Sequence, residues 1–173
     1  MKTLTLSCFL LFNNFNNASD QVNSTTKSYL VVKIKDGDTI DILINNTSQT
    51  IRLAHIDCPE KKQPFGNIAK QFVEKQCFKK YITLQGNNKY DRNHRLIAEV
   101  ILTNGINLNQ LLVKNGMAWH FKKYSTSKTY ADLQNISQKN KIGLWAMENP
   151  IEPAEWRKQK KRKNNTPPST FQR

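Results

Sequence analysis

The sequence predicts an α+β domain that is mainly β: a small five-stranded closed barrel decorated with about three helices. Segments rich in Val, Ile and Leu alternate apolar with polar residues, as half-buried strands do. Asp-Gly and Asn-rich stretches separate these segments, as hairpin turns do. One stretch with helical spacing then interrupts the series of strands.

Residues 29–36, 39–44 and 50–56 are expected to form three strands of an antiparallel meander. In the third of these segments Arg52 stands between the apolar residues Ile51 and Leu53. Because successive side chains of a strand point to opposite faces, Arg52 is expected to point away from the apolar face.

A helix is expected over residues 67–80, where Ile68, Phe72 and Val73 recur at helical spacing. The remaining expected elements are two strands and two short helices, at residues 81–84, 96–102, 108–115 and 130–141. Five strands with a helix inserted after the third are typical of the OB-fold barrel.

The chain is expected to divide into four parts. Residues 1–19 have the pattern of a cleaved secretory signal peptide. A positively charged N-terminus is followed by a short apolar run and then by small residues at the expected cleavage site. This predicts a secreted or periplasmic protein that has no membrane segment in its mature form. Residues 20–28 would be a linker, residues 29–150 the folded domain, and residues 151–173 a Pro-containing basic tail that is largely unpacked.

The chain has 173 residues and a formal net charge of +14, from 27 Lys and Arg against 13 Asp and Glu. Such an excess favours a polyanionic partner, with nucleic acid first and an anionic membrane surface or acidic glycan second. Solubility alone is the plain alternative. A monomer is expected, and charge by itself does not identify the partner.

Only Cys58 and Cys77 would remain after signal cleavage. A disulfide between them and two separate thiols are both open, with separate positions favoured: one in a loop, the other on the buried face of a helix. Without a Cys-x-x-Cys spacing, a structural zinc site is not expected.

Carboxylates follow two neighbouring predicted strands. The first group is Asp36-Gly-Asp-Thr39, and the second is Asp57-Cys-Pro-Glu60. Taken alone, the first is an ordinary hairpin turn and the second a solvated acidic loop. However, Pro59 forces an extended backbone before it, so the carboxylates can converge from the ends of adjacent strands. Carboxylate oxygens are the ligands that calcium and magnesium prefer.

Arginines accompany these acids. Arg52 lies between the two acidic turns, and Arg95 lies in a later polar loop. A guanidinium presents a planar fork of donors that matches phosphate, which Lys cannot reproduce. A divalent cation, a carboxylate base and two arginines are what hydrolysis of a phosphodiester needs, because water must be activated and charge on the phosphate neutralised.

Several motifs in a fixed order carry a resemblance to a known family. They are Asp36-Gly-Asp-Thr, Ile51-Arg-Leu-x-x-Ile-Asp-Cys-Pro-Glu60, Gln63-Pro-Phe-Gly66, Asp91…Arg95, Asn115-Gly-Met-Ala-Trp119, Gly143-Leu-Trp145 and Pro153-x-Glu-Trp156-Arg. Together they resemble the secreted bacterial branch of the staphylococcal nuclease (thermonuclease) family, over about residues 29–158. The resemblance implies a calcium-dependent nuclease that cuts DNA and RNA without sequence specificity and leaves 3′-phosphate ends.

The resemblance also implies roles by position. Asp38, Asp57 and the backbone carbonyl of Cys58 would bind Ca²⁺, with Asp36 beyond the direct ligands. Glu60 would be the general base, while Arg52 and Arg95 would stabilise the phosphorane-like transition state. Arg92 and Tyr124 would contact the substrate, which is expected to be single-stranded or breathing nucleic acid. The sequence departs from the family pattern at Cys58, where Thr is usual, at the loop Asp91-Arg-Asn-His-Arg95, which lacks the usual Tyr and Gly, and at Lys122, where Tyr is expected.

Two other functions are weighed against this one. Asp91-Arg-Asn-His94 resembles the motif of ββα-metal nucleases, which would make His94 the base of a magnesium enzyme. Alternatively, the chain would be a non-catalytic OB-fold module that binds single strands through basic and aromatic side chains. The strand pattern opposes the first alternative, and the presence of all the acids and arginines opposes the second.

Overall fold

The computed structural model describes residues 27–165, and side chains up to residue 162. The predicted signal peptide, most of the linker and residues 166–173 lie outside this part of the chain. Five strands form a closed barrel in the order β1-β2-β3-β6-β5, which confirms the predicted barrel. Their bounds are β1 Ser28–Ile34, β2 Thr39–Ile44, β3 Thr47–Leu53, β5 Tyr81–Gln85 and β6 Leu96–Leu102.

One hairpin and one parallel strand pair set the register that matters for the site. Strand β2 pairs antiparallel with β3, and the register places Thr39 opposite Arg52. The turn between these strands is Asn45–Asn46, and both residues have positive φ (49° and 62°), as tight hairpin turns favour. Strand β3 then pairs in parallel with β6 to close the barrel. The start of β2, just after the Asp36–Asp38 turn, therefore lies beside the end of β3.

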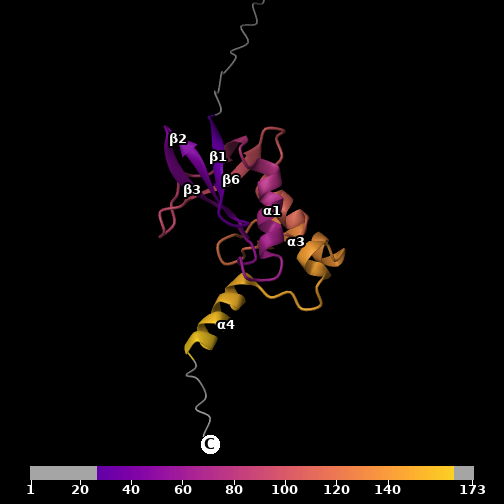
Figure 1. Cartoon of the computed structure of the whole chain (residues 1–173). Helices are drawn as coiled ribbons and strands as arrows, with labels where there is room; N and C mark the ends of the chain where they lie inside the picture. The colour runs from indigo at the N-terminus through magenta and orange to yellow at the C-terminus, as the bar shows by residue number, and fades with distance from the viewer. Residues whose placement is uncertain (1–26, 166–173) are drawn as a thin grey trace, which may run out of the picture.

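Helix α1 (Gly66–Cys77) packs along the barrel, as Figure 1 shows. The helix was expected, with Val73 buried and Phe72 packed against the core, but Ile68 departs from the expected face. Ile68 is 47% exposed, and the buried positions are Ala69, Val73 and Cys77, at intervals of four residues. Small side chains are needed here because the turn at Gly37 comes close: a Cβ on Gly37 would lie 2.9 Å from the Cβ of Ala69.

Two further helices, α2 (Leu108–Lys114) and α3 (Lys128–Lys139), confirm the two predicted after the last barrel strand. They pack on each other and α2 also contacts β6. Three short elements were not predicted: the strands β4 (Ile56–Asp57) and β7 (Trp119–His120), which pair with each other, and the 3-10 turn η1 (Gly143–Ala146). Pairing between β4 and β7 brings a distant segment beside Asp57.

Part of the C-terminal segment is helical, which the expectation of a largely unpacked tail did not include. Residues Pro153–Asn165 form helix α4, which extends below the barrel in Figure 1 (yellow). Four α-helices therefore decorate the barrel within residues 27–165, rather than about three. None of the helices described is both long and apolar enough to cross a membrane.

The core fills the barrel and the space beneath α1 and α2 with aliphatic side chains. Cys58 and Cys77 are both buried and both free, so they are not joined in a disulfide. One follows β4 in a loop and the other lies on the buried face of α1, as favoured from the sequence. Burial raises the pKa of the Cys77 thiol to about 12, which keeps it protonated and unreactive at neutral pH.

Candidate active site

Asp38 joins the two acidic turns to each other. It is buried, with 7% of its surface exposed, at the end of the hairpin turn that precedes β2. Its Oδ1 accepts a hydrogen bond from the Thr39 hydroxyl (3.1 Å), and its Oδ2 accepts one from the backbone N–H of Cys58 (2.8 Å). The turn itself is braced by Asp36, whose Oδ1 accepts from the Asp38 N–H (3.0 Å). The carboxylate of Asp38 is therefore fixed against the backbone of the second acidic turn.

Asp57 lies 5% exposed at the end of β4, where it pairs with Trp119 of β7. Arg52 connects it to Asp38. One terminal nitrogen of the guanidinium, Nη2, lies 3.1 Å from Asp57 Oδ1 and 3.3 Å from Asp38 Oδ2. The other, Nη1, donates to the carbonyl of Leu53 (2.8 Å). As expected, Arg52 points away from the apolar face of β3, and the two predicted metal-binding aspartates share one arginine.

Glu60 lies at the edge of this cluster, and its side chain is 41% exposed. Its backbone N–H donates to the side chain of Gln63 (3.0 Å), which holds the loop in place. Its Oε1 accepts a hydrogen bond from Arg157 Nη1 (2.6 Å), while Nη2 of the same guanidinium donates to Asp57 Oδ2 (3.0 Å). A residue of α4 thus bridges the proposed base and a proposed metal ligand.

Arg157 was not predicted as a site residue. It was part of the quoted motif Pro153-x-Glu-Trp156-Arg, which was the one signal that could have singled it out. The local sequence pattern could not have identified Arg157, because the two acidic partners of Arg157 lie 97 and 100 residues earlier in the chain.

Negative charge is crowded at this end of the barrel. Burial and then the nearby charge of Asp38 raise the pKa of Asp36 to about 6. The same two causes, in the same order, raise the pKa of Asp57, although Arg157 and Arg52 oppose them. Carboxylates that raise each other's pKa in this way are those that a bound cation stabilises.

This donor set fits a hard cation such as Ca²⁺. No group of three or more His, Cys, Asp or Glu side chains within residues 27–162 is arranged as a metal site. The predicted ligand set needs only two, Asp38 and Asp57, with a backbone carbonyl and solvent to complete it. Cys58 cannot serve through its thiol, because burial and then the charge of Asp38 raise its pKa well above the usual value, and thiolates do not suit calcium.

Arg95 approaches the cluster but is held by a different acid. Its Nε and Nη2 lie 2.8 and 2.7 Å from Asp91 Oδ2, and its Nη1 lies 3.4 Å from the Thr39 hydroxyl. Partial burial would raise the pKa of Asp91, but hydrogen bonds from Arg95 and from the backbone lower it. Arg95 is thus placed next to the Asp38 turn by a salt bridge from its own loop.

The other loop residues lie further out. Arg92 is exposed in the turn that follows Asp91. His94 is also exposed, with a φ of 56°, and its carbonyl lies 3.5 Å from the Gln49 amide. Asp91, the acid of the alternative His94 motif, is engaged by Arg95 rather than by His94.

Aromatic side chains flank Arg52 on the other side. Tyr124 is 71% exposed and packs edge-on against Phe121, with ring centroids 4.8 Å apart. The guanidinium carbon of Arg52 lies 6.0 Å from the centroid of Phe121. The predicted substrate-contacting tyrosine is therefore linked to the cluster through one aromatic ring.

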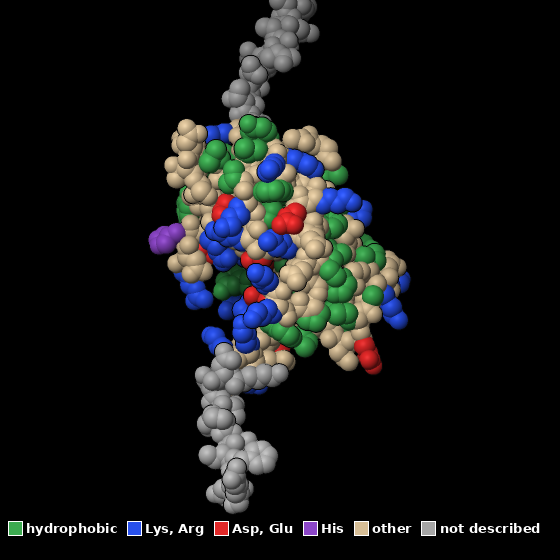
Figure 2. Space-filling model, in the orientation of Figure 1, with side chains coloured by type: hydrophobic (Ala, Val, Ile, Leu, Met, Phe, Trp, Pro, Cys, Tyr) green, Lys and Arg blue, Asp and Glu red, His purple; other side chains and the backbone are tan. Residues whose placement is uncertain are grey.

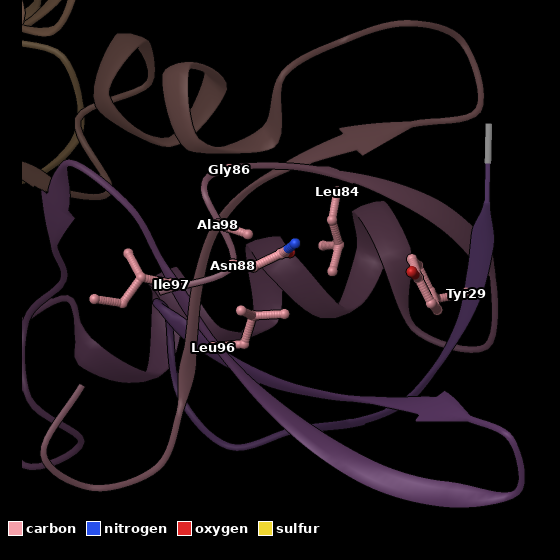
Figure 3. Close-up of a pocket in the computed structure, with 7 residues that line it drawn as sticks. All are labelled: Tyr29, Leu84, Gly86, Asn88, Leu96, Ile97 and Ala98. Atoms are coloured by element: carbon pink, nitrogen blue, oxygen red, sulfur yellow. The ribbon is translucent and has the colours of Figure 1, made fainter. Parts of the chain in front are cut away.

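Two hollows are present on the described surface. One is lined by Tyr29, Leu84, Gly86, Asn88, Leu96, Ile97 and Ala98, and Figure 3 shows that its lining includes none of the predicted site residues. The other contains Asp57 and lies between the β7 region, with Lys122 and Lys123, and the start of α4 at Pro153. Figure 2 shows Lys and Arg side chains crowded around carboxylates on the visible face. Of the predicted site residues, only Asp57 lines the second hollow, together with the positive charges of Lys122 and Lys123.

The sequence matches a family model and named proteins. Residues 50–147 match the family model described as "Staphylococcal nuclease homologue". The chain is 41% identical over 161 residues to an "Uncharacterized endonuclease" of Haemophilus influenzae, covering 92% of this chain and 87% of that protein. It is 33% identical over 145 residues to a "Micrococcal nuclease" of Shigella flexneri, covering 78% of this chain and 83% of that protein.

Proposed function

Because this chain belongs to the staphylococcal nuclease family and is a phosphodiester hydrolase, we propose that it is a calcium-dependent endonuclease that cuts DNA and RNA without sequence specificity. The observation that carries the proposal is the convergence of Asp38, Asp57 and Arg52, from two turns, onto one set of contacts. By the family resemblance, the cut releases the 5′-oxygen and leaves a 3′-phosphate.

Each side chain has a task in this proposal. Glu60 accepts the proton of the attacking water, and its partial exposure gives water access to it. Arg52 and Arg95 donate hydrogen bonds to the non-bridging phosphate oxygens, where negative charge grows during the reaction. Asp38, Asp57 and the carbonyl of Cys58 would hold Ca²⁺, which supplies a Lewis acid that draws charge from the phosphate.

The substrate side of the proposal rests on the surface around the cluster. Tyr124 offers an exposed ring for stacking and Arg92 an exposed positive charge. Stacking on a ring requires an unpaired base, so single-stranded or breathing regions would be the preferred substrate. A secreted or periplasmic monomer, as its sequence suggests, would meet such substrate outside the cytoplasm.

A gel assay tests the proposal directly. Single-stranded DNA, duplex DNA and RNA are each incubated with the protein and with calcium, magnesium or a chelator. We expect cutting of all three with calcium, fastest on single strands, and none with the chelator. The 3′ ends of the products should accept a 5′-phosphorylated adaptor only after phosphatase treatment has removed a 3′-phosphate. Binding without cutting under every condition would favour the non-catalytic OB-fold module, and cutting with magnesium alone would favour the His94 mechanism.

Exposed lysines on helix α4 are expected to contribute to the binding of nucleic acid. Lys160 and Lys161 are exposed on it. Replacing both with Gln should weaken binding of single-stranded DNA. The negative slope of log K against log salt should become less steep by about 1.4, since each phosphate contact contributes about 0.7 to its magnitude. Turnover at saturating substrate should stay near wild type, because neither residue touches the acidic cluster.

The matched control for this prediction removes the same charge elsewhere. Lys139→Gln with Lys141→Gln takes two exposed lysines from the end of α3 instead. Equal salt slopes for the two double variants would show that α4 makes no special contribution to binding.

A further inference from the structure

Arg157 is the residue of α4 that enters the acidic cluster. Its guanidinium spans two acids, with 2.6 Å between Nη1 and Glu60 Oε1 and 3.0 Å between Nη2 and Asp57 Oδ2. Its side chain is 42% exposed, so it reaches the site from the rim rather than from the core. A guanidinium that contacts both carboxylates places its positive charge where the proposed cation would bind.

The start of α4 is tied to the Glu60 loop by an independent link. Gln63 is 7% exposed, and its Oε1 accepts the N–H of Glu60 while its Nε2 donates to the carbonyl of Ile151 (2.6 Å), just before the helix. Pro153, the first residue of α4, is itself buried. Two features therefore fix the start of α4 and position Arg157 over the acids: the hydrogen bond between Gln63 and Ile151, and the burial of Pro153.

Both oxygens of Asp57 are already engaged by arginines. Oδ1 accepts from Arg52 and Oδ2 from Arg157. A cation that binds this carboxylate would lie beside two guanidiniums of like charge, so it competes with them for Asp57. Arg52 is the harder one to move, because its side chain is 12% exposed and also holds Asp38 and the Leu53 carbonyl. Arg157 approaches from the solvent side, on α4, so its guanidinium is the one we expect to leave Asp57.

We propose that Arg157 is a further residue of the nuclease site, and that its guanidinium and the divalent cation exchange for each other at Asp57, which also frees Glu60. This inference rests on the calcium site of the proposed function. Without the cation, Arg157 neutralises these two acids and holds α4 over the site. When the cation binds, Arg157 leaves Asp57, and α4 loosens from the Glu60 loop.

Isothermal titration of calcium chloride into the nucleic-acid-free protein tests the exchange. Arg157→Gln should tighten calcium binding by roughly three- to tenfold, the range expected when two part-exposed ion pairs no longer compete. The matched control is Lys158→Gln, which removes the same charge from the next position, where Lys158 pairs with Glu155 (3.6 Å) and not with the cluster. It should change the affinity by less than about twofold.

A second readout follows α4 itself by hydrogen exchange. In the wild type, calcium should speed exchange of the amides of residues 154–162. In Arg157→Gln, exchange should be fast already and respond little to calcium. A purely structural role for Arg157 would loosen α4 in the variant but would not make the wild-type helix respond to calcium.

Calcium affinities of three variants test the exchange at Asp57 and the calcium site separately. Equal calcium affinities for Arg157→Gln and Lys158→Gln, or a weaker affinity for Arg157→Gln, overturn the exchange while the calcium site stands. Asp57→Asn should abolish the binding heat. If the wild type and Asp57→Asn bind calcium equally, or neither binds it, the calcium site itself is refuted.

Discussion

Replacing Glu60 with Gln is expected to lower the turnover of nucleic acid by about 10²–10⁴, the usual contribution of a general base. Gln keeps the size of the side chain and can still accept a hydrogen bond from Arg157, but it cannot take a proton from water. The ion pair to Arg157 is part-exposed on both sides, so its loss should cost no more than about 1 kcal/mol of folding free energy. Single-turnover cleavage at saturating calcium measures the effect.

Two controls make the result specific. Glu74→Gln removes an exposed carboxylate of α1 whose partner is Lys70 (3.6 Å), and its turnover should match the wild type. His94→Ala should also cut normally, because His94 is exposed away from the acidic cluster. If Glu60→Gln retained most of its activity while His94→Ala lost it, the assignment of the base would be wrong.

Replacing Arg52 with Met should damage both stability and catalysis. The side chains of Asp38 and Asp57 are only 10% and 7% exposed, so without Arg52 two buried carboxylates lose a shared partner. Leaving buried charge uncompensated costs about 3 kcal/mol or more. Catalysis should fall by about 10²–10³, as when one donor to a transition-state oxyanion is removed.

Denaturant unfolding with and without calcium, together with cleavage rates, checks the Arg52 prediction. Calcium should restore part of the lost stability, because a cation bound to the folded state neutralises the same acids. Arg52→Lys should keep more stability than Arg52→Met but still cut poorly, since Lys lacks the planar fork. Lys70→Met, a surface cation of α1, is the control and should change little. A stable and active Arg52→Met protein would contradict the role given to this arginine.

The barrel and the meeting of the two acidic turns could be predicted from local pattern. Strand β6 has the bounds that alternation predicted, and the short turns leave few ways to connect β1, β2 and β3. Because the three strands run antiparallel, the turn after β1 and the turn after β3 lie at the same end of the barrel. The placement of Arg52 followed from the two-residue period of a strand.

The errors come from contacts that local pattern does not record. The sequence after residue 150 is rich in charge and proline, which favours an unpacked tail, yet α4 docks through Arg157 and the Ile151 carbonyl to residues far earlier in the chain. On α1 the prediction failed at Ile68, which is exposed, while the small Ala69 is the side chain that faces the close turn at Gly37. Strands as short as β4 and β7 carry no periodic signal at all.

Diffraction from crystals of the wild-type protein grown with calcium would test the central claim most directly. We expect one strong anomalous peak between the carboxylates of Asp38 and Asp57, within ligand distance (about 2.3–2.6 Å) of both and of the Cys58 carbonyl. The Arg157 guanidinium should be displaced from Asp57 in the same crystals. A calcium peak elsewhere on the protein, with the two aspartates still bridged by arginines, would contradict it.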